Sequence, residues 1–458
     1  MTAVPRRRLC VPKQKRRGVN DGGNLPPVDR GRGAYTYLFA SFLFETTTWG
    51  GAYAYGVFQE YHTHNPASAL YGKASPAATS VVGTLVLAGL HFSPLLTRGF
   101  FRTNPHLIKR TSMCTILIAV VSLIIASFFG GNIAALIAFQ GIIYGVAAGI
   151  TFTAVILWLP QWFDKRRGTA SGVIYAGSAV GGTVFPLIIN ALLQRVGFAW
   201  TVRIQAAYTL VLMCIAIYLI RPRLPIPSRD AEPRRSLLRS LAPDGLKVLL
   251  RPLSLLYIGI LVFHAGAFNT VSLYLSSYTT SLGFSPATGT GVLSAFNACA
   301  FVSFLTIGRL IDALSTPVLM SICATISALS AFFFWGFSNS LVLLIIFTLV
   351  FGATAGGFTT FLTPAAKDIS SMNNQETSTV YLALIFLRGI AVVLFPLIAG
   401  TIYDSEKGTS FQLYGLGGFR GLVIFTGCMM LVPGALATVV SRYRKSLLVS
   451  GTTGATTG

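Results

Sequence analysis

The sequence contains few charged residues, and most of them carry the same sign. Only 10% of its 458 residues are charged, and 13 acidic residues stand against 35 basic ones. A soluble globular domain carries about 25% charged residues, so this composition excludes an ordinary soluble domain. The six cysteines form no CxxC pair. Most of them lie in apolar stretches, and we interpret them as small core residues, not as a disulfide or metal framework.

The sequence also lacks the short motifs that mark common enzyme sites. It contains no HExxH pair and no GxSxG nucleophile elbow, and its apolar stretches hold no cluster of Asp or of Cys and His. These absences predict a protein that is not an enzyme and needs no cofactor and no metal. The first 33 residues contain no apolar run, so we expect no cleavable signal peptide. We interpret them as a basic cytoplasmic tail, with a mitochondrial presequence as the alternative.

Long apolar stretches fill the chain from about Tyr35 to Val440. Roughly 20 apolar residues cross the hydrocarbon core as a helix, whereas the strands of a membrane barrel alternate with period two, which these stretches do not. The sequence therefore predicts an all-α polytopic membrane protein. The twelve expected spans are 35–58, 79–96, 111–129, 133–159, 168–194, 199–220, 254–279, 288–308, 316–337, 340–363, 378–403 and 419–440.

The basic residues indicate the orientation of these spans. The formal net charge is +22, and Lys and Arg gather in the two tails and in alternate loops, which is the positive-inside pattern. We therefore expect both termini in the cytoplasm, an even number of spans, and attraction of the basic loops to anionic lipid. This placement argues against a nucleic-acid partner. We expect a plasma-membrane location. The sequence does not define the oligomeric state, and it is compatible with a monomer.

The spans fall into two similar sets. YGVAAGITFT at 144–153 matches FGATAGGFTT at 351–360, and VFPLIINAL at 184–192 matches LFPLIAGTI at 394–402. Two parallel repeats of six spans are an architecture of transporters, with the binding site near the membrane midplane. The expected organisation is a basic tail (1–34), an N-terminal six-helix half (35–220), a cytoplasmic linker (221–253), a C-terminal six-helix half (254–440) and a cytoplasmic tail (441–458).

Three motifs make the chain resemble the major facilitator superfamily, and within it the fungal branch of the monocarboxylate porters. They are WGGAYAYGVFQEYH after the first span, GVAAGITFTAVILWLPQWFDKRRGTASGVIYAGSAVGGTVFP across the fourth and fifth, and the weaker pair NACAF and GRLID in the eighth. The resemblance implies the twelve-helix major facilitator fold, in which two halves rock around a central site. It also implies an organic anion as the cargo.

The chain departs from this family in two places. The loop LLTRGFFRTNPHLIKRTS between the second and third spans lacks the Asp that the superfamily usually carries there. Relatives often carry an Arg in the eighth span that is a candidate partner for a substrate carboxylate, and Phe304 occupies that position here. This departure argues against simple monocarboxylates such as lactate or pyruvate.

Ionisable residues inside a bilayer are functional candidates, because inserting one costs about 2.5–3.5 kcal/mol. Glu45, Arg388 and His264 lie in the middle of their spans. Glu45 is a candidate for proton coupling, with a structural hydrogen bond or an ion pair to Arg388 as the alternative. Arg388 is a candidate for binding a carboxylate through its planar fork, with an interhelical ion pair as the alternative. The binding cation would then have moved from the eighth span to the eleventh.

Further candidates surround these residues. For substrate binding the sequence adds four polar side chains to Arg388, each of which also has a structural interpretation in the helix core: Tyr144, Asn269, Asn297 and His264. For gating, a charged loop between the fourth and fifth spans and its counterpart after the eighth could hold the halves together, or could reflect topology alone. These gating residues are Asp164, Lys165, Arg166, Arg167, Arg309 and Asp312.

The sequence thus predicts a secondary active transporter that moves a small organic acid with a proton, by alternating access. Its partners would be the organic anion, the proton and the lipid bilayer. One alternative is an efflux transporter for a dicarboxylate or a secondary metabolite. Another is a membrane sensor that binds the acid without moving it, which the short tails disfavour.

Overall fold

Long helices make up the regular structure of the protein. The computed structural model describes residues 25–225, 246–370, 374–406, 414–416 and 418–453, and these residues contain no strand. The predicted tail up to residue 24, the centre of the predicted linker (226–245) and residues 454–458 lie outside the described residues.

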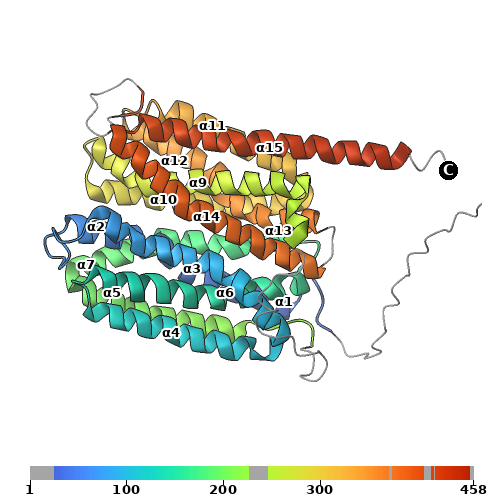
Figure 1. Ribbon diagram of the computed structural model, residues 1–458, viewed down its shortest axis with the longest axis horizontal. Coiled ribbons are helices and arrows are strands. Elements are labelled where there is room, and N and C mark those ends of the chain that lie inside the picture. The colour runs from blue at the N-terminus through green and yellow to red at the C-terminus, as the bar shows by residue number, and fades with distance from the viewer. Residues whose placement is uncertain (1–24, 226–245, 371–373, 407–413, 417, 454–458) are drawn as a thin grey trace, which may run out of the picture.

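The helices form two groups that lie side by side (Figure 1). The N-terminal group comprises α1 (Arg32–Tyr53), α2 (Tyr55–His64), α3 (Pro76–Thr103), η1 (Pro105–Leu107), α4 (Ile108–Phe128), α5 (Ile133–Leu136), η2 (Ile137–Ile143), α6 (Tyr144–Trp162) and α7 (Arg167–Leu219). The C-terminal group comprises η3 (Leu246–Leu250), α9 (Pro252–Ser281), α10 (Pro286–Ala313), α11 (Thr316–Ser330), η4 (Ala331–Trp335), α12 (Leu341–Ala355), η5 (Gly356–Phe361), α13 (Leu362–Ile369), α14 (Asn374–Glu406) and α15 (Arg420–Thr453).

These helices confirm the predicted fold class. Within the described chain, ten helical stretches are long and apolar enough to cross a membrane. One of them, α7, has 53 residues and is divided by the non-helical backbone of Gly197, at φ 73°, into the predicted fifth and sixth spans. With α7 counted twice and α1 added, the helices give the twelve predicted crossings. Large apolar side chains stay exposed on the outer faces of α4, α11 and α12, where lipid would cover them.

The two groups meet along two pairs of helices, α7 with α10 and α3 with α14. α1 begins and α15 ends at the same end of the bundle, which we call the termini side (Figure 1). The loop between α6 and α7, the end of α10 and α13 also lie on the termini side. The opposite end, with α2, is the far side.

Glycines allow the closest helix contacts. A Cβ on Gly50 of α1 would lie 2.4 Å from the Cα of Gly181 of α7, and a Cβ on Gly172 would lie 2.4 Å from the carbonyl oxygen of Phe304 on α10. Such contacts leave no room for any side chain. Small residues let helix backbones approach closely in membranes, where dispersion contacts hold helices together. α7 therefore packs tightly on both sides, against α1 in its own group and against α10 in the other.

Gly50→Ala should destabilise the protein by about 1–3 kcal/mol, the usual cost of an overpacked contact, because the added methyl group meets the backbone of α7. Gly56→Ala is the matched control, since a Cβ on Gly56 would find no atom within 4 Å. Thermal unfolding of the two variants in detergent makes the comparison. Equal midpoints for both variants would show that the α1–α7 contact is looser than described here.

Candidate functional site

A central cavity lies between the two helix groups. It contains about 520 Å³ of space between atoms, and both groups line it. Polar and aromatic side chains from seven α-helices and from η5 line it. They are Glu45, Trp49 and Tyr53 of α1, His91 of α3, Phe152 of α6, Tyr175 and Ser178 of α7, Asn269 of α9, Phe304 of α10, Thr359 of η5 and Arg388 of α14. A site shared by the two groups is where alternating access requires the substrate to bind.

Glu45 is a buried carboxylate at this interface. Its side chain is 1% exposed, and its Oε1 has no hydrogen-bond partner among the described residues. Glycines of α7 allow the close packing around it, because a Cβ on Gly177 would lie 3.1 Å from the Cβ of Glu45. Glu45 also borders a second, smaller cavity together with Ser171, Tyr175 and Tyr381. The carboxylate therefore lies where the central cavity and the second cavity meet.

Arg388 brings a buried cation into the same cavity from the C-terminal group. It is 6% exposed, and its Nη1 has no partner among the described residues. The hydroxyl groups of Tyr53 and Tyr381 lie within electrostatic range of its guanidinium. The following residue, Gly389, packs against α3, so α14 holds Arg388 close to the N-terminal group.

Glu45 and Arg388 do not form an ion pair with each other in the part of the chain that the structure describes. Tyr53 lies within electrostatic range of both. A buried charge without a partner is strongly unfavourable, so a purely structural ion pair does not account for the two residues. Both residues line the central cavity.

The cavity gathers some of the other predicted binding residues and not the rest. Asn269 lines it, and its Nδ2 donates to the Ala265 carbonyl at 2.8 Å. His264 lies outside the lining, where its Nε2 donates to the Ala355 carbonyl at 3.0 Å and its ring stacks on Phe358 at 4.0 Å.

Two more predicted binding residues also lie outside the lining. Asn297 faces α7 and donates to the Leu293 carbonyl at 3.1 Å. Tyr144 is buried at the start of α6 beside Gly51. The structure thus gives Asn297 and Tyr144 surroundings in the helix interior, and their substrate roles stay predictions.

His91 is a cavity residue that is absent from the predicted binding residues. Its Nδ1 lies 2.8 Å from the Leu87 carbonyl, and its ring meets the edge of Trp49 with centroids 4.8 Å apart. The signal was present, because a histidine inside an apolar stretch meets the same criterion that selected His264. Phe304 also lines the cavity, and its ring centroid lies 6.0 Å from that of Tyr175. The position at which relatives often carry an Arg therefore faces the cavity here with an aromatic ring.

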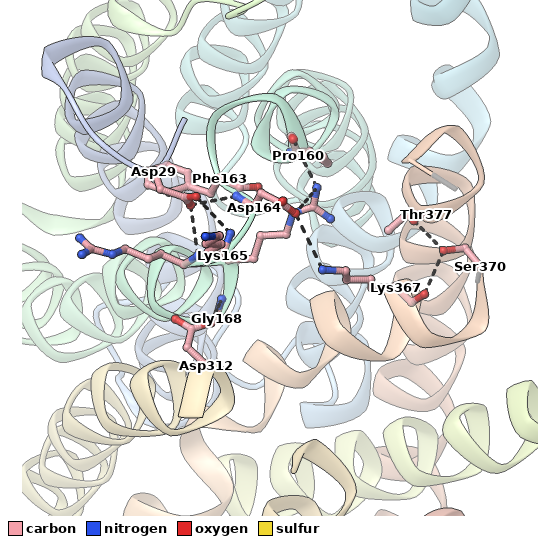
Figure 2. A network of polar contacts seen from close by, with 12 residues as sticks. Asp29, Pro160, Phe163, Asp164, Lys165, Gly168, Asp312, Lys367, Ser370 and Thr377 are labelled. Carbon is pink, nitrogen blue, oxygen red and sulfur yellow. Dashed lines mark hydrogen bonds and ion pairs between the residues drawn. The ribbon is translucent and has the colours of Figure 1, made fainter. Parts of the chain in front are cut away.

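On the termini side, a carboxylate joins the two groups (Figure 2). Asp312, at the end of α10, accepts hydrogen bonds from the backbone N–H of Gly168 at 2.9 Å and of Thr169 at 2.8 Å, and from the Thr169 hydroxyl at 2.7 Å. These donors belong to the first turn of α7, where the helix dipole also favours a negative charge. The predicted gating residue Asp312 is thus a cap on a helix of the opposite group.

Two further contacts close the termini side. Lys367 of α13 lies 3.8 Å from Asp164 in the loop before α7, and the hydroxyls of Ser171 and Thr363 lie 2.9 Å apart. The ion pair is largely exposed and contributes little by itself. Of the other predicted gating residues, Arg167 is buried and donates to the Phe163 carbonyl at 2.6 Å, whereas Arg309 is exposed.

The remaining two predicted gating residues, Lys165 and Arg166, contribute backbone groups. Together with Asp164 they donate their N–H groups to the carboxylate of Asp29, at 2.9 Å from Asp164 and 3.1 Å from the other two (Figure 2). No sequence pattern marked Asp29 as a candidate. Burial alone would raise the pKa of its carboxyl, but these backbone donors and the charge of Arg166 outweigh burial and lower that pKa. Asp29 thus ties the start of the described chain to the loop before α7.

Comparison with known protein families identifies the fold. The family model described as "Major Facilitator Superfamily" matches residues 34–396. The chain belongs to the major facilitator superfamily. It is therefore an integral, multi-pass membrane protein with the fold of a transporter. Its central cavity and its termini-side contacts lie between the two groups of helices.

Several fungal members of the superfamily are similar over much of the chain. "MFS-type transporter 1" of Ophiocordyceps sp. is 27% identical over 66% of this chain, which spans 63% of that relative's length. "Aspyridones efflux protein apdF" of Emericella nidulans is 28% identical over a stretch that covers 85% of this chain and 74% of the relative's length. "MFS-type transporter pynF" of Aspergillus niger is 26% identical over a stretch that covers 96% of this chain and 95% of the relative's length.

A solved structure supports the same fold. The human organic anion transporter MFSD10 superposes with a TM-score of 0.62, covering 89% of this chain and 99% of the human one, at 18% sequence identity. At this identity the likeness concerns the fold alone.

Removing the Asp29 carboxylate should destabilise the protein. Asp29→Ala should cost about 1 kcal/mol, as for other side chains that cap helix N–H groups. The folded pKa lies below the ordinary 3.8, so this contribution is complete above the unfolded pKa and is lost as the pH falls through the folded one. The gap in thermal midpoint between wild type and Asp29→Ala should be constant from pH 5 to 7 and shrink below about pH 3.8. A gap that shrinks between pH 7 and 5 would contradict this account.

Removing the Asp312 carboxylate should open the termini side. A helix cap contributes about 1 kcal/mol, so Asp312→Ala should raise access to the cavity about fivefold. In a background without native cysteines, the rate at which Ser178→Cys reacts with a polar maleimide from the termini side measures that access. Asp404→Ala is the control, because this exposed carboxylate lies at the far end of α14. If Ser178→Cys reacts at the same rate with and without Asp312→Ala, Asp312 does not hold the two groups together.

Proposed function

We propose that the protein is a secondary active transporter that moves an organic acid anion across a membrane together with a proton. One observation carries this proposal: Glu45 and Arg388, each buried and without a full set of partners among the described residues, line a single cavity between the two helix groups. A cation there calls for an anion, and a carboxylate beside it can take up a proton.

Arg388 binds the acid group of the substrate in this proposal. A guanidinium offers two parallel N–H donors to a carboxylate, which gives both strength and orientation. The resemblance to monocarboxylate porters supports an acidic cargo, and Arg388 on α14 replaces the cation that relatives often carry at the position of Phe304. Aromatic neighbours of the cavity favour an acid larger than lactate or pyruvate.

Glu45 couples a proton to this movement. With the substrate on Arg388 and a proton on Glu45, the cavity holds no uncompensated charge, so the two groups can rock past each other around a neutral interface. The termini-side contacts of Asp312, Lys367 and Thr363 then release, and contacts on the far side form. By the distribution of basic residues, the termini side faces the cytoplasm, and we place the protein in the plasma membrane.

A second candidate function is efflux of an acidic secondary metabolite. Two observations favour it: a fungal relative is named as an efflux protein for aspyridones, and five aromatic residues, Trp49, Tyr53, Phe152, Tyr175 and Phe304, line the cavity. The two candidates share Arg388 as the anion site and differ in cargo size and direction. Uptake and efflux of radiolabelled mono- and dicarboxylates and aromatic acids in proteoliposomes separate them.

Substitution of the two charged residues tests the proposed roles on the acid that the wild type moves fastest. Glu45→Gln should abolish accumulation driven by a proton gradient and spare exchange of labelled for unlabelled acid. Arg388→Lys should raise KM about tenfold or more, because the loss of a hydrogen bond to a charged group costs about 1.5–3 kcal/mol.

Arg195→Lys on the far side of α7 is the control, since Arg195 is exposed and outside the cavity lining. Undiminished proton-driven accumulation in Glu45→Gln would remove the proton from this residue. A wild-type KM in Arg388→Lys would place the acid group elsewhere.

A further inference from the structure

His91 gives the cavity a second polar group of a different kind. It lies on α3 with 3% of its surface exposed, and it lines the same cavity as Arg388. A Cβ on Gly389 would lie only 2.4 Å from the Cβ of His91. Since Gly389 follows Arg388 directly, α3 and α14 place the imidazole and the guanidinium at the same level of the cavity, one from each helix group.

The hydrogen bond of His91 to its own helix decides what the ring can offer. Its Nδ1 lies 2.8 Å from the carbonyl oxygen of Leu87. A carbonyl oxygen only accepts, so Nδ1 carries the hydrogen, and in the neutral ring Nε2 is left with a lone pair. Among the described residues no side chain or backbone group bonds to Nε2. In the neutral imidazole, Nε2 is therefore a hydrogen-bond acceptor to which no described residue donates.

Aromatic packing holds the ring of His91 in place. The edge-on contact between His91 and Trp49 has centroids 4.8 Å apart and an interplanar angle of 88°. Trp49 in turn packs against Phe152 at 5.8 Å. With Tyr175 and Phe304, these rings give the cavity walls that suit a flat, unsaturated ligand.

We propose that His91 is a specificity-determining residue that accepts a hydrogen bond from a substrate hydroxyl, and that the substrate class is an aromatic acid carrying a phenolic or enolic hydroxyl group. This inference rests on the proposed function, because it takes Arg388 as the site of the acid group. The cavity then offers one complement to each part of the substrate: a cation for the acid, an acceptor for the hydroxyl and aromatic walls for the ring.

The test compares acids that differ by a single hydroxyl group. Binding of 4-hydroxyphenylacetate and phenylacetate, and of 4-hydroxybenzoate and benzoate, is measured on the full-length protein in detergent by calorimetry. Wild type should bind the hydroxylated member of at least one pair about tenfold more tightly. A buried acceptor left unpaired disfavours the analogue that lacks the hydroxyl.

His91→Phe keeps a ring against Trp49 and removes the acceptor. His91→Phe should lower the affinity for the hydroxylated acid about tenfold and leave the affinity for the acid without the hydroxyl group unchanged. His91→Gln restores an acceptor oxygen and should recover part of the preference, which also guards against a fold defect in the first variant. His106→Gln, at an exposed histidine of η1, is the control.

The outcomes separate this inference from the proposed function. If Arg388→Lys weakens both members of a pair and His91→Phe changes neither, the role of His91 is wrong and the anion site stands. A loss of affinity for both members in His91→Phe shows general disruption and also overturns the role of His91. If wild type binds none of the four acids, the substrate class and this role both fail, while transport of other acids still tests the proposed function.

Discussion

The burial of two unpaired charges between two helix groups is the constraint on which this protein depends. In a membrane, water cannot stabilise Glu45 and Arg388, and the described residues do not pair them with each other. The close helix packing through glycines and the aromatic walls surround this unfavourable arrangement without neutralising it. In the proposed function, a bound anion and a proton supply these missing partners, so occupancy of the site changes the stability of the interface that must move.

The first turn of α7 connects that interface to the closed end of the molecule. Two carboxylates accept hydrogen bonds here. Asp29, before α1, binds N–H groups of the loop that precedes α7, and Asp312, from the opposite helix group, binds N–H groups of α7 itself. Only the second contact crosses between the groups. If the groups separate on this side, Asp312 leaves α7 while Asp29 stays, so the loop keeps a cap through the transport cycle. The same helix carries Ser171 and Tyr175, which border the cavities at Glu45.

The sequence predicts the membrane spans well because the thickness of the bilayer fixes the length of an apolar helix. It also predicts Glu45, Arg388 and Asn269 as residues of the interior, and the structure brings these three to one cavity. It does not distinguish His264 from His91. Both lie deep in apolar stretches, and which one faces the cavity depends on the rotation of its helix against its neighbours. Near-uniform hydrophobicity around a membrane helix carries little information on that rotation.

Asp29 illustrates a second limit. Its partners lie 135 to 137 residues away along the chain, and it precedes the first span in a segment without periodic pattern. No local rule connects such a residue to the loop before α7. Asp312 and the loop before α7 could be selected together as gating candidates, by contrast, because both are charged segments at the ends of apolar spans.

The most direct test of the central claim is to measure acid and proton movement together. Proteoliposomes containing a pH-sensitive dye are exposed to a gradient of the acid that the wild type transports, with no imposed pH gradient. The account predicts that the acid gradient drives protons in the same direction as the acid, and that Glu45→Gln abolishes this proton movement. Acid flux without any proton movement in the wild type would contradict the claim that Glu45 and Arg388 form a shared proton and anion site.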